Sequence, residues 1–177
     1  MKRTLLILAT LLLTVLAHAQ HMVYDTNVRT LQVTLNDNPL LPPVLKLGKS
    51  SFLRISWDEM SHDYHRYVYR IQHCTRDWEP TEDLFESDYL HGTNGLPVED
   101  YETSFNTTQL YTHYSLTFPN RDASVLLSGN YKLLIYEEDF MDNGPIIEVR
   151  FHVVEAEMGL TMQVSSNTDI DFNDKHQ

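Results

Sequence analysis

Three neighbouring residues, His73, Cys74 and Asp77, are of types that bind metals or act as a nucleophile with its base. The cysteine is the only one in the chain, so no internal disulfide can form. Adjacent residues of a strand point to opposite faces of a sheet, so His73 and Cys74 cannot both face one ion. We therefore interpret these residues as structural, with Cys74 a buried thiol. We predict no metal site and no cofactor.

Acidic residues could supply the two carboxyl groups that glycoside hydrolysis requires. The candidate groups are Asp58 and Glu59, Glu82 and Asp83, Glu99 to Glu102, and Glu137 to Asp139. Acidic loops on an acidic protein usually form solvated surface, and no serine has the sequence context of a hydrolase nucleophile. Calcium binding by residues 137–143 is a weaker alternative, because the spacing is not that of an EF-hand. We predict no catalytic residue, and a hydrolase is the third of three hypotheses.

The charge and the first residues indicate where the protein acts. The chain carries a formal net charge of −12, which disfavours binding to nucleic acid or to anionic lipid. Lys2 and Arg3 precede an apolar run from Leu5 to Leu16 and a small-residue cleavage site at Ala17-His18-Ala19. This pattern is typical of a secretory signal peptide over residues 1–19. We expect an exported protein beginning at Gln20, without direct insertion into a membrane.

Alternation of apolar and polar residues predicts an all-β protein. The clearest strand begins at Tyr67 and ends before Trp78, with Tyr67, Tyr69, Ile71 and His73 on one face. Further strands are predicted over residues 28–35, 52–57, 111–118, 126–136 and 147–153, with an edge strand or extended loop at 40–47 and a last strand at 160–164. Ser128 to Tyr131 resembles a tyrosine corner. The pattern favours an immunoglobulin-like or fibronectin-like antiparallel β-sandwich.

The stretch from Trp78 to Thr108 lacks this alternation and is rich in acidic, aromatic and turn-forming residues. We predict one long ordered loop excursion, with a short helical turn beginning at Thr81. If Trp78, Tyr89, Tyr101 and Tyr111 formed one flat patch, they could stack on sugar rings. A carbohydrate-binding or adhesion module is therefore the second hypothesis.

Several short sequence motifs, taken in their order along the chain, resemble those of the type IX secretion system plug protein family of Bacteroidetes. They are Tyr69 to Cys74 with Asp77-Trp78, Tyr89 to Gly92, Asp100-Tyr101 with Ser104 to Thr107, Tyr111 to Tyr114 with Phe118 to Asn120, and Leu127 to Tyr131. The resemblance implies a non-enzymatic β-sandwich in the periplasm, at the periplasmic face of the outer membrane. It implies that the protein docks on a giant outer-membrane β-barrel translocon and occludes it. We expect the first domain of such a plug over residues 20–160 and the truncated start of a following β domain over 161–177.

The resemblance also divides the distinctive residues into two groups. The candidate partner-docking residues of the excursion are Trp78, Tyr89, His91, Tyr101 and Phe105. The candidate structural residues of the family signature are His73, Cys74, Asp77, His113, Tyr114, Asn130 and Tyr131. The first group is predicted from the length and aromatic content of the excursion.

Overall fold

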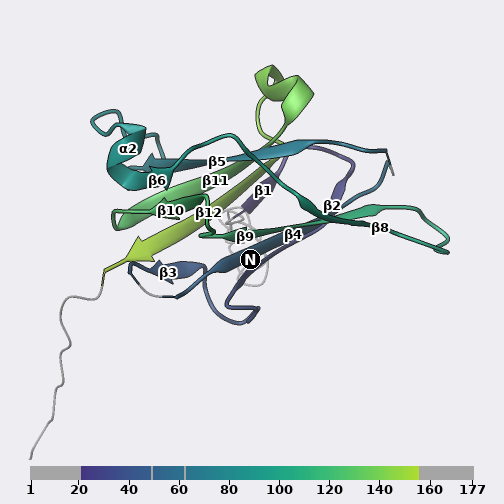
Figure 1. Ribbon diagram of the computed structural model, residues 1–177, viewed down its shortest axis with the longest axis horizontal. Helices are drawn as coiled ribbons and strands as arrows, with labels where there is room; N and C mark the ends of the chain where they lie inside the picture. Colours follow the sequence, from purple (N-terminus) through teal and green to yellow (C-terminus); the bar gives the residue numbers. More distant parts are fainter. Residues whose placement is uncertain (1–20, 49, 62, 156–177) are drawn as a thin grey trace, which may run out of the picture.

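Two β-sheets pack face to face in the computed structural model, which describes residues 21–48, 50–61 and 63–155 (Figure 1). Sheet A contains β1 (His21–Val23), β3 (Val44–Lys46), β5 (Tyr67–Cys74), β7 (Leu96–Pro97), β11 (Gly129–Glu137) and β12 (Ile147–Val154). Sheet B contains β2 (Val28–Leu35), β4 (Leu53–Glu59), β8 (Asp100–Thr103) and β9 (Thr112–Phe118). A separate pair is formed by β6 (Leu90–Gly92) and β10 (Ala123–Val125).

The strand order is that of an immunoglobulin-like sandwich. Sheet B runs β2-β4-β9-β8, which matches the A-B-E-D order of that fold. In sheet A, β5, β11 and β12 are adjacent and antiparallel, which matches the C-F-G order. The short strand β3 pairs in parallel with β12, so the proline-containing segment forms an edge strand. The all-β sandwich prediction is confirmed.

The core is built from the inward faces of both sheets. Residues of β4 alternate strictly between buried and half-buried, as a strand with one face on a core should. Trp57 of β4 is fully buried; its ring stacks on Tyr114 at 5.4 Å and meets Tyr67 edge-on at 5.8 Å. Tyr67 belongs to sheet A, so these rings join the two layers.

The tyrosine corner is present at the beginning of β11. The Tyr131 hydroxyl donates a hydrogen bond to the carbonyl oxygen of Leu127 at 2.8 Å. The Tyr131 ring is buried and stacks on Phe151 at 5.5 Å. The strand itself starts at Gly129, three residues later than predicted, because residues 126–128 form the turn that this hydrogen bond closes.

The excursion after β5 is ordered through short elements that pair with the sheets. It contains the short helix α2 (Glu86–Tyr89) and three strands. Of these strands, β6 pairs with β10, β7 with β5, and β8 with β9. The short helix begins at Glu86, five residues after the predicted start at Thr81, and residues 82–83 form a turn between them. Thr81 itself bonds to His73 through both its amide and its hydroxyl.

Other elements differ from the predictions in detail. The strand β1 was not predicted, and β4 continues two residues past Trp57 to the buried Glu59. A 3₁₀ segment, η1 (Glu138–Asn143), joins β11 to β12. Among the helices that the structure describes, none has the length and apolarity to cross a membrane. The predicted signal peptide, the strand at 160–164 and the start of a further domain at 161–177 lie outside the described residues.

Candidate interaction surface

The five predicted docking residues are divided between the two ends of the sandwich. Trp78, Tyr89 and His91 belong to the segment that carries α2 and β6, whereas Tyr101 lies in β8 and Phe105 follows it. Figure 1 shows α2 and β6 at one end of the molecule and β8 at the other. The structure therefore does not bring these residues together on one surface.

Two of the five are held by packing. Tyr89 is only 9% exposed, and its hydroxyl donates to the Ile71 carbonyl oxygen at 3.4 Å. The half-buried Trp78 lies under the Arg150 guanidinium, whose carbon is 5.2 Å from the ring centre. Burial leaves Tyr89 little surface for a partner, so its sequence signal is explained by the core. Docking through any of the five remains a prediction.

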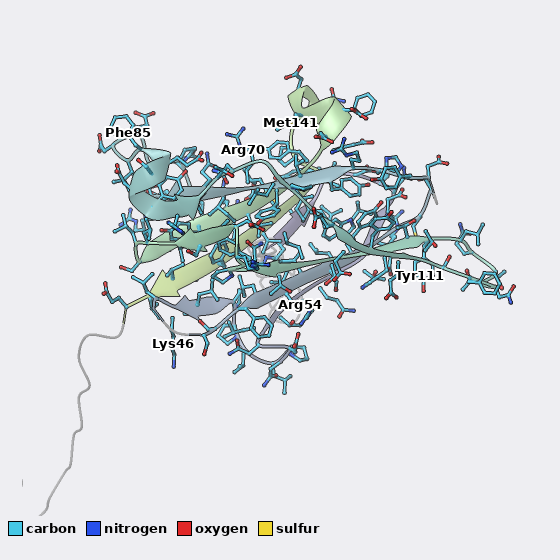
Figure 2. All side chains as sticks on the ribbon, in the orientation of Figure 1. Lys46, Arg54, Arg70, Phe85, Tyr111 and Met141 are labelled. Atoms are coloured by element: carbon cyan, nitrogen blue, oxygen red, sulfur yellow. The ribbon has the colours of Figure 1, made fainter. Side chains whose placement is uncertain are left out.

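The opposite end of the molecule carries exposed apolar side chains. We define the hairpin-end surface as Tyr64, Tyr101, Phe105 and Leu110. Their exposed fractions are 67%, 44%, 85% and 43%. Tyr64 lies against Tyr101 at 5.8 Å, and the ring of Tyr101 in turn contacts the buried ring of Tyr114 at 5.8 Å. Figure 2 places Tyr111, the residue after Leu110, at the end of the molecule opposite Phe85.

The loop that presents Phe105 is stiffened by its own hydrogen bonds. It joins β8 to β9, which pair antiparallel from Asp100 to Thr103. At its base, the Ser104 amide donates to the Tyr111 carbonyl oxygen at 2.9 Å, and the Tyr111 amide donates to Ser104 Oγ at 2.8 Å. At its tip, the Thr107 hydroxyl donates to the Gln109 carbonyl oxygen at 2.7 Å. A loop ordered before binding loses less conformational entropy on docking.

Charge is distributed unevenly along this hairpin. Residues 103–111 carry no charged side chain, in a chain whose net charge is −12. Glu99, Asp100 and Glu102 precede them and are exposed. The result is a neutral, partly apolar tip on an acidic base, which is complementary to an apolar site with a basic rim.

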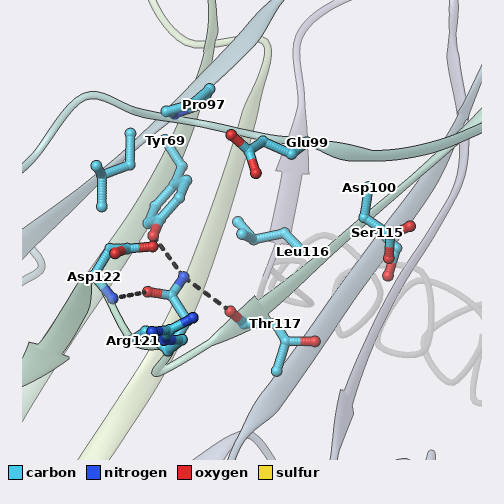
Figure 3. A pocket seen from close by; sticks show the side chains of 11 residues that line it. Tyr69, Pro97, Glu99, Asp100, Ser115, Leu116, Thr117, Arg121 and Asp122 are labelled. Carbon is cyan, nitrogen blue, oxygen red and sulfur yellow. Dashed lines mark hydrogen bonds between the residues drawn. The ribbon is translucent and has the colours of Figure 1, made fainter.

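A cavity of about 390 Å³ opens between the sheets at the β7 and β9 edges (Figure 3). Tyr69 and Leu116 line its apolar part, and Glu99 and Asp122 are among its polar lining. Asn120 Nδ2 donates to the Tyr69 hydroxyl oxygen at 2.7 Å, and burial raises the pKa of Tyr69. Its eleven lining residues include no histidine, cysteine or lysine, so they offer no activated nucleophile with a nitrogen base.

A second cavity of about 240 Å³ lies beside Tyr64 and Tyr101. The planes of these two rings are inclined by 59°, so they do not form the flat patch that favours stacking on a sugar ring. His65, Arg66 and Glu99 contribute its polar lining. The cavity adjoins the hairpin-end surface and extends it toward the loop after β4.

One polar cluster was not predicted from the sequence. His65 Nδ1 lies 2.6 Å from Glu137 Oε1, and His65 Nε2 lies 3.0 Å from Ser61 Oγ. This order of groups resembles a serine, histidine and carboxylate triad. The Ser61 hydroxyl, however, donates to the buried carboxylate of Glu59 at 2.8 Å, because a carboxylate can only accept. Its proton therefore points away from His65, and the cluster serves to satisfy the buried Glu59.

Asp58, another of the acidic candidates, is also held by local contacts. Asp58 Oδ1 lies 2.6 Å from His113 Nδ1 across the β4–β9 pair, and Asp58 also accepts from the Thr30 hydroxyl. Over residues 21–48, 50–61 and 63–155, no three His, Cys, Asp or Glu side chains are grouped so that they could hold a metal ion. His73 faces the inside of sheet A and Cys74 the outside, where burial raises the pKa of the Cys74 thiol.

The candidate structural residues mostly join separate elements. His73 Nδ1 lies 2.8 Å from Thr81 Oγ1, and burial lowers the pKa of His73. Asn130 donates to the Thr75 carbonyl oxygen at 3.0 Å and contacts His152 at 2.8 Å. The Tyr114 hydroxyl donates to the His65 carbonyl oxygen at 3.1 Å, and burial raises its pKa to about 12. Asp77 is exposed beside Arg76 at 3.5 Å. Their membership of a family signature remains a prediction.

Comparison with known proteins identifies a matching family and a similar solved structure. The family described as the type 9 secretion system plug protein 1st domain matches residues 28–155. The chain is also similar to a hypothetical protein from Parabacteroides merdae, whose crystal structure was determined at 2.30 Å resolution. The two are 33% identical with a TM-score of 0.75, and the similarity covers 89% of this chain and 39% of that protein. No curated protein matches the chain.

Proposed function

The chain belongs to the family of type 9 secretion system plug protein first domains, and we propose that it docks on the outer-membrane translocon of that system and occludes it. It would act at the periplasmic face of the outer membrane, after export directed by residues 1–19. Residues 20–160 would be the first domain of the plug, and residues 161–177 would begin the next one. It would act by binding to the closed translocon and would catalyse no reaction.

The observation that carries this proposal is the hairpin-end surface. Phe105 is 85% exposed on a hydrogen-bonded loop, although exposing a phenylalanine to water is unfavourable. Exposed apolar groups that gather at one site commonly mark protein interaction surfaces. The acidic base of the hairpin supports a partner surface with basic residues around an apolar site.

The structure also supports a binding role over a catalytic one. The lining of the cavity at β7 and β9 includes no histidine, cysteine or lysine that could activate or replace its Ser115 and Thr117 hydroxyls, and the Ser61 hydroxyl donates to Glu59. Carbohydrate binding is the second candidate, since Tyr64 and Tyr101 flank a cavity of about 240 Å³. The inclined rings make that cavity a less favourable sugar platform than a coplanar pair.

Affinity capture tests the proposal. The chain from Gln20 is immobilised and exposed to outer-membrane extracts of Bacteroidetes cells that carry the type IX system, and bound proteins are identified by mass spectrometry. Recovery of the giant barrel supports docking. Retention on polysaccharide resin, with no barrel recovered from membranes, would instead favour the carbohydrate-binding alternative.

A matched pair of variants then locates the contact. Burying a phenylalanine side chain contributes about 1.5–3 kcal/mol, so Phe105→Ser should weaken binding to the purified barrel roughly 10- to 150-fold. Phe85→Ser is the control, because Phe85 is 80% exposed at the other end of the molecule. Equal affinities for the two variants would exclude the hairpin-end surface as the docking site.

A further inference from the structure

The edge strand β8 of sheet B has backbone groups that no other described strand uses. It is the last strand of its sheet and, within the described residues, pairs with β9 alone. The Ser104 amide bonds to the Tyr111 carbonyl oxygen, so by the alternation of an antiparallel pair Glu102 also directs its N–H and C=O groups toward β9. The N–H and C=O groups of Tyr101 and Thr103 therefore point outward, and every residue of β8 is exposed. Such an edge can accept one more strand.

The side chains of β8 give its two faces different chemistry. Tyr101 faces inward, where its ring contacts the buried ring of Tyr114 at 5.8 Å. Asp100 and Glu102 alternate with Tyr101 and lie on the outer face of sheet B. The ion pairs formed between described residues include neither of these carboxylates. An added strand would therefore meet an aromatic ring on one face and two negative charges on the other.

The neighbouring strand β9 does not compensate the charge of Glu102. His113 lies directly across from Glu102, but its Nδ1 lies 2.6 Å from Asp58 Oδ1 in β4. The other side of Glu102 is the open edge of the sheet. A basic side chain in an added strand would lie directly opposite Glu102 there, and cross-strand pairs of opposite charge stabilise a sheet.

The same charges disfavour pairing with a second copy of this chain. Two copies of β8 could pair antiparallel in two registers through the outward groups of Tyr101 and Thr103. In one register Glu102 lies opposite its own copy, and in the other it lies opposite Asp100. Like charges directly opposite each other destabilise a sheet. The edge therefore selects against self-association and favours a basic strand.

We propose that β8 accepts an extended antiparallel segment of a partner protein, with lysine or arginine opposite Asp100 and Glu102 and apolar side chains opposite Tyr101 and Thr103. Main-chain hydrogen bonds would hold this segment, and the alternating side chains would supply specificity. Because Tyr101 belongs to the hairpin-end surface, this mode of binding rests on the proposed docking function and specifies the conformation and charge of the segment that docks.

A synthetic peptide of alternating lysine and valine tests the edge directly. It is titrated into the isotope-labelled chain from Gln20, and binding is followed by chemical shifts and amide hydrogen exchange. At saturation the amides of Tyr101 and Thr103 should exchange at least about 10-fold more slowly, because the added strand protects them. The Ser104 amide, already bonded to Tyr111, should not change. Unchanged exchange at both outward amides would overturn strand addition.

Matched peptides and variants identify the contacts. In the proposed register the valine amides bond to β8 and the lysine amides point away. Methylating the valine nitrogens should therefore abolish binding, whereas methylating the lysine nitrogens should preserve it. Glu102→Lys should weaken binding roughly 2- to 30-fold. Glu82→Lys makes the same charge change at an exposed residue before α2 and should have a smaller effect. Equal effects within either pair contradict the proposal.

Binding to the purified barrel distinguishes two kinds of failure. If the barrel binds without protecting the amides of Tyr101 and Thr103, docking stands and strand addition is wrong. If the peptide binds and the barrel does not, the docking function is wrong and the basic-strand site on β8 stands.

Discussion

Replacing Gly129 by alanine tests how closely the start of β11 packs on His73. Gly129 has a φ of 152°, and a Cβ built on it would lie 2.4 Å from His73 Nε2. The imidazole is not free to turn aside, because its Nδ1 contacts Thr81 Oγ1 at 2.8 Å and its ring meets Tyr131 edge-on at 5.0 Å. The substitution must therefore displace β11 or break the His73 contacts.

The expected loss follows from three costs. The backbone conformation is unfavourable for a residue with a Cβ by roughly 1 kcal/mol. Loss of the hydrogen bond between His73 and Thr81 costs about 1 kcal/mol, and overpacking costs about 1–3 kcal/mol. Since relieving the clash sacrifices the hydrogen bond, the costs overlap, and Gly129→Ala should lower the free energy of unfolding by about 2–4 kcal/mol. For a domain of this size, Tm should fall by roughly 5–15 °C.

Urea denaturation followed by far-UV circular dichroism measures this loss, with a double-mutant cycle to identify its cause. In a His73→Ala background, Gly129→Ala should cost at least about 1 kcal/mol less, because the clashing ring is absent. Gly95→Ala is the matched control: its φ is 80°, and nothing lies within 4 Å of the added Cβ. The reasoning is refuted if Gly95→Ala and Gly129→Ala cost the same, or if removing the His73 ring leaves the cost of Gly129→Ala unchanged.

Two further predictions concern the same junction. Tyr131→Phe should lower the free energy of unfolding by about 1 kcal/mol in urea denaturation, because the Leu127 carbonyl oxygen loses its 2.8 Å donor; a loss no larger than that of Tyr101→Phe, at an exposed ring, would contradict it. Burial lowers the pKa of His73 below its ordinary value of 6.5. As the pH falls, the unfolded chain therefore binds a proton at this residue before the folded chain does. The stability contributed by neutral His73 is complete above about pH 6.5 and declines as the pH falls below it. Between about pH 7.5 and about pH 5.5 the wild type should therefore lose more stability than His73→Gln, and equal losses would exclude His73 as the cause.

The sequence by itself determined the strands and the faces that they bury. Alternation identified Tyr67, Tyr69 and Ile71 as inward residues, and all three are buried in β5. This succeeds because side-chain direction in a strand repeats every two residues, whatever the strand packs against. The tyrosine corner was also predictable, since Tyr131 bonds to a residue only four positions earlier. The resemblance to the plug family depended on short sequence motifs in a particular order along the chain. The family match over residues 28–155 confirms that resemblance.

Only the tertiary structure decided which residues are available to a partner. The excursion has no periodicity, so the sequence could not distinguish the buried Tyr89 from the exposed Phe105 or place them at opposite ends. The contacts of His65 with Ser61 and Glu137 could not be predicted either, because Glu137 comes from a strand 72 positions away. Local pattern specifies how each strand is oriented, whereas long-range pairing determines which surfaces remain uncovered.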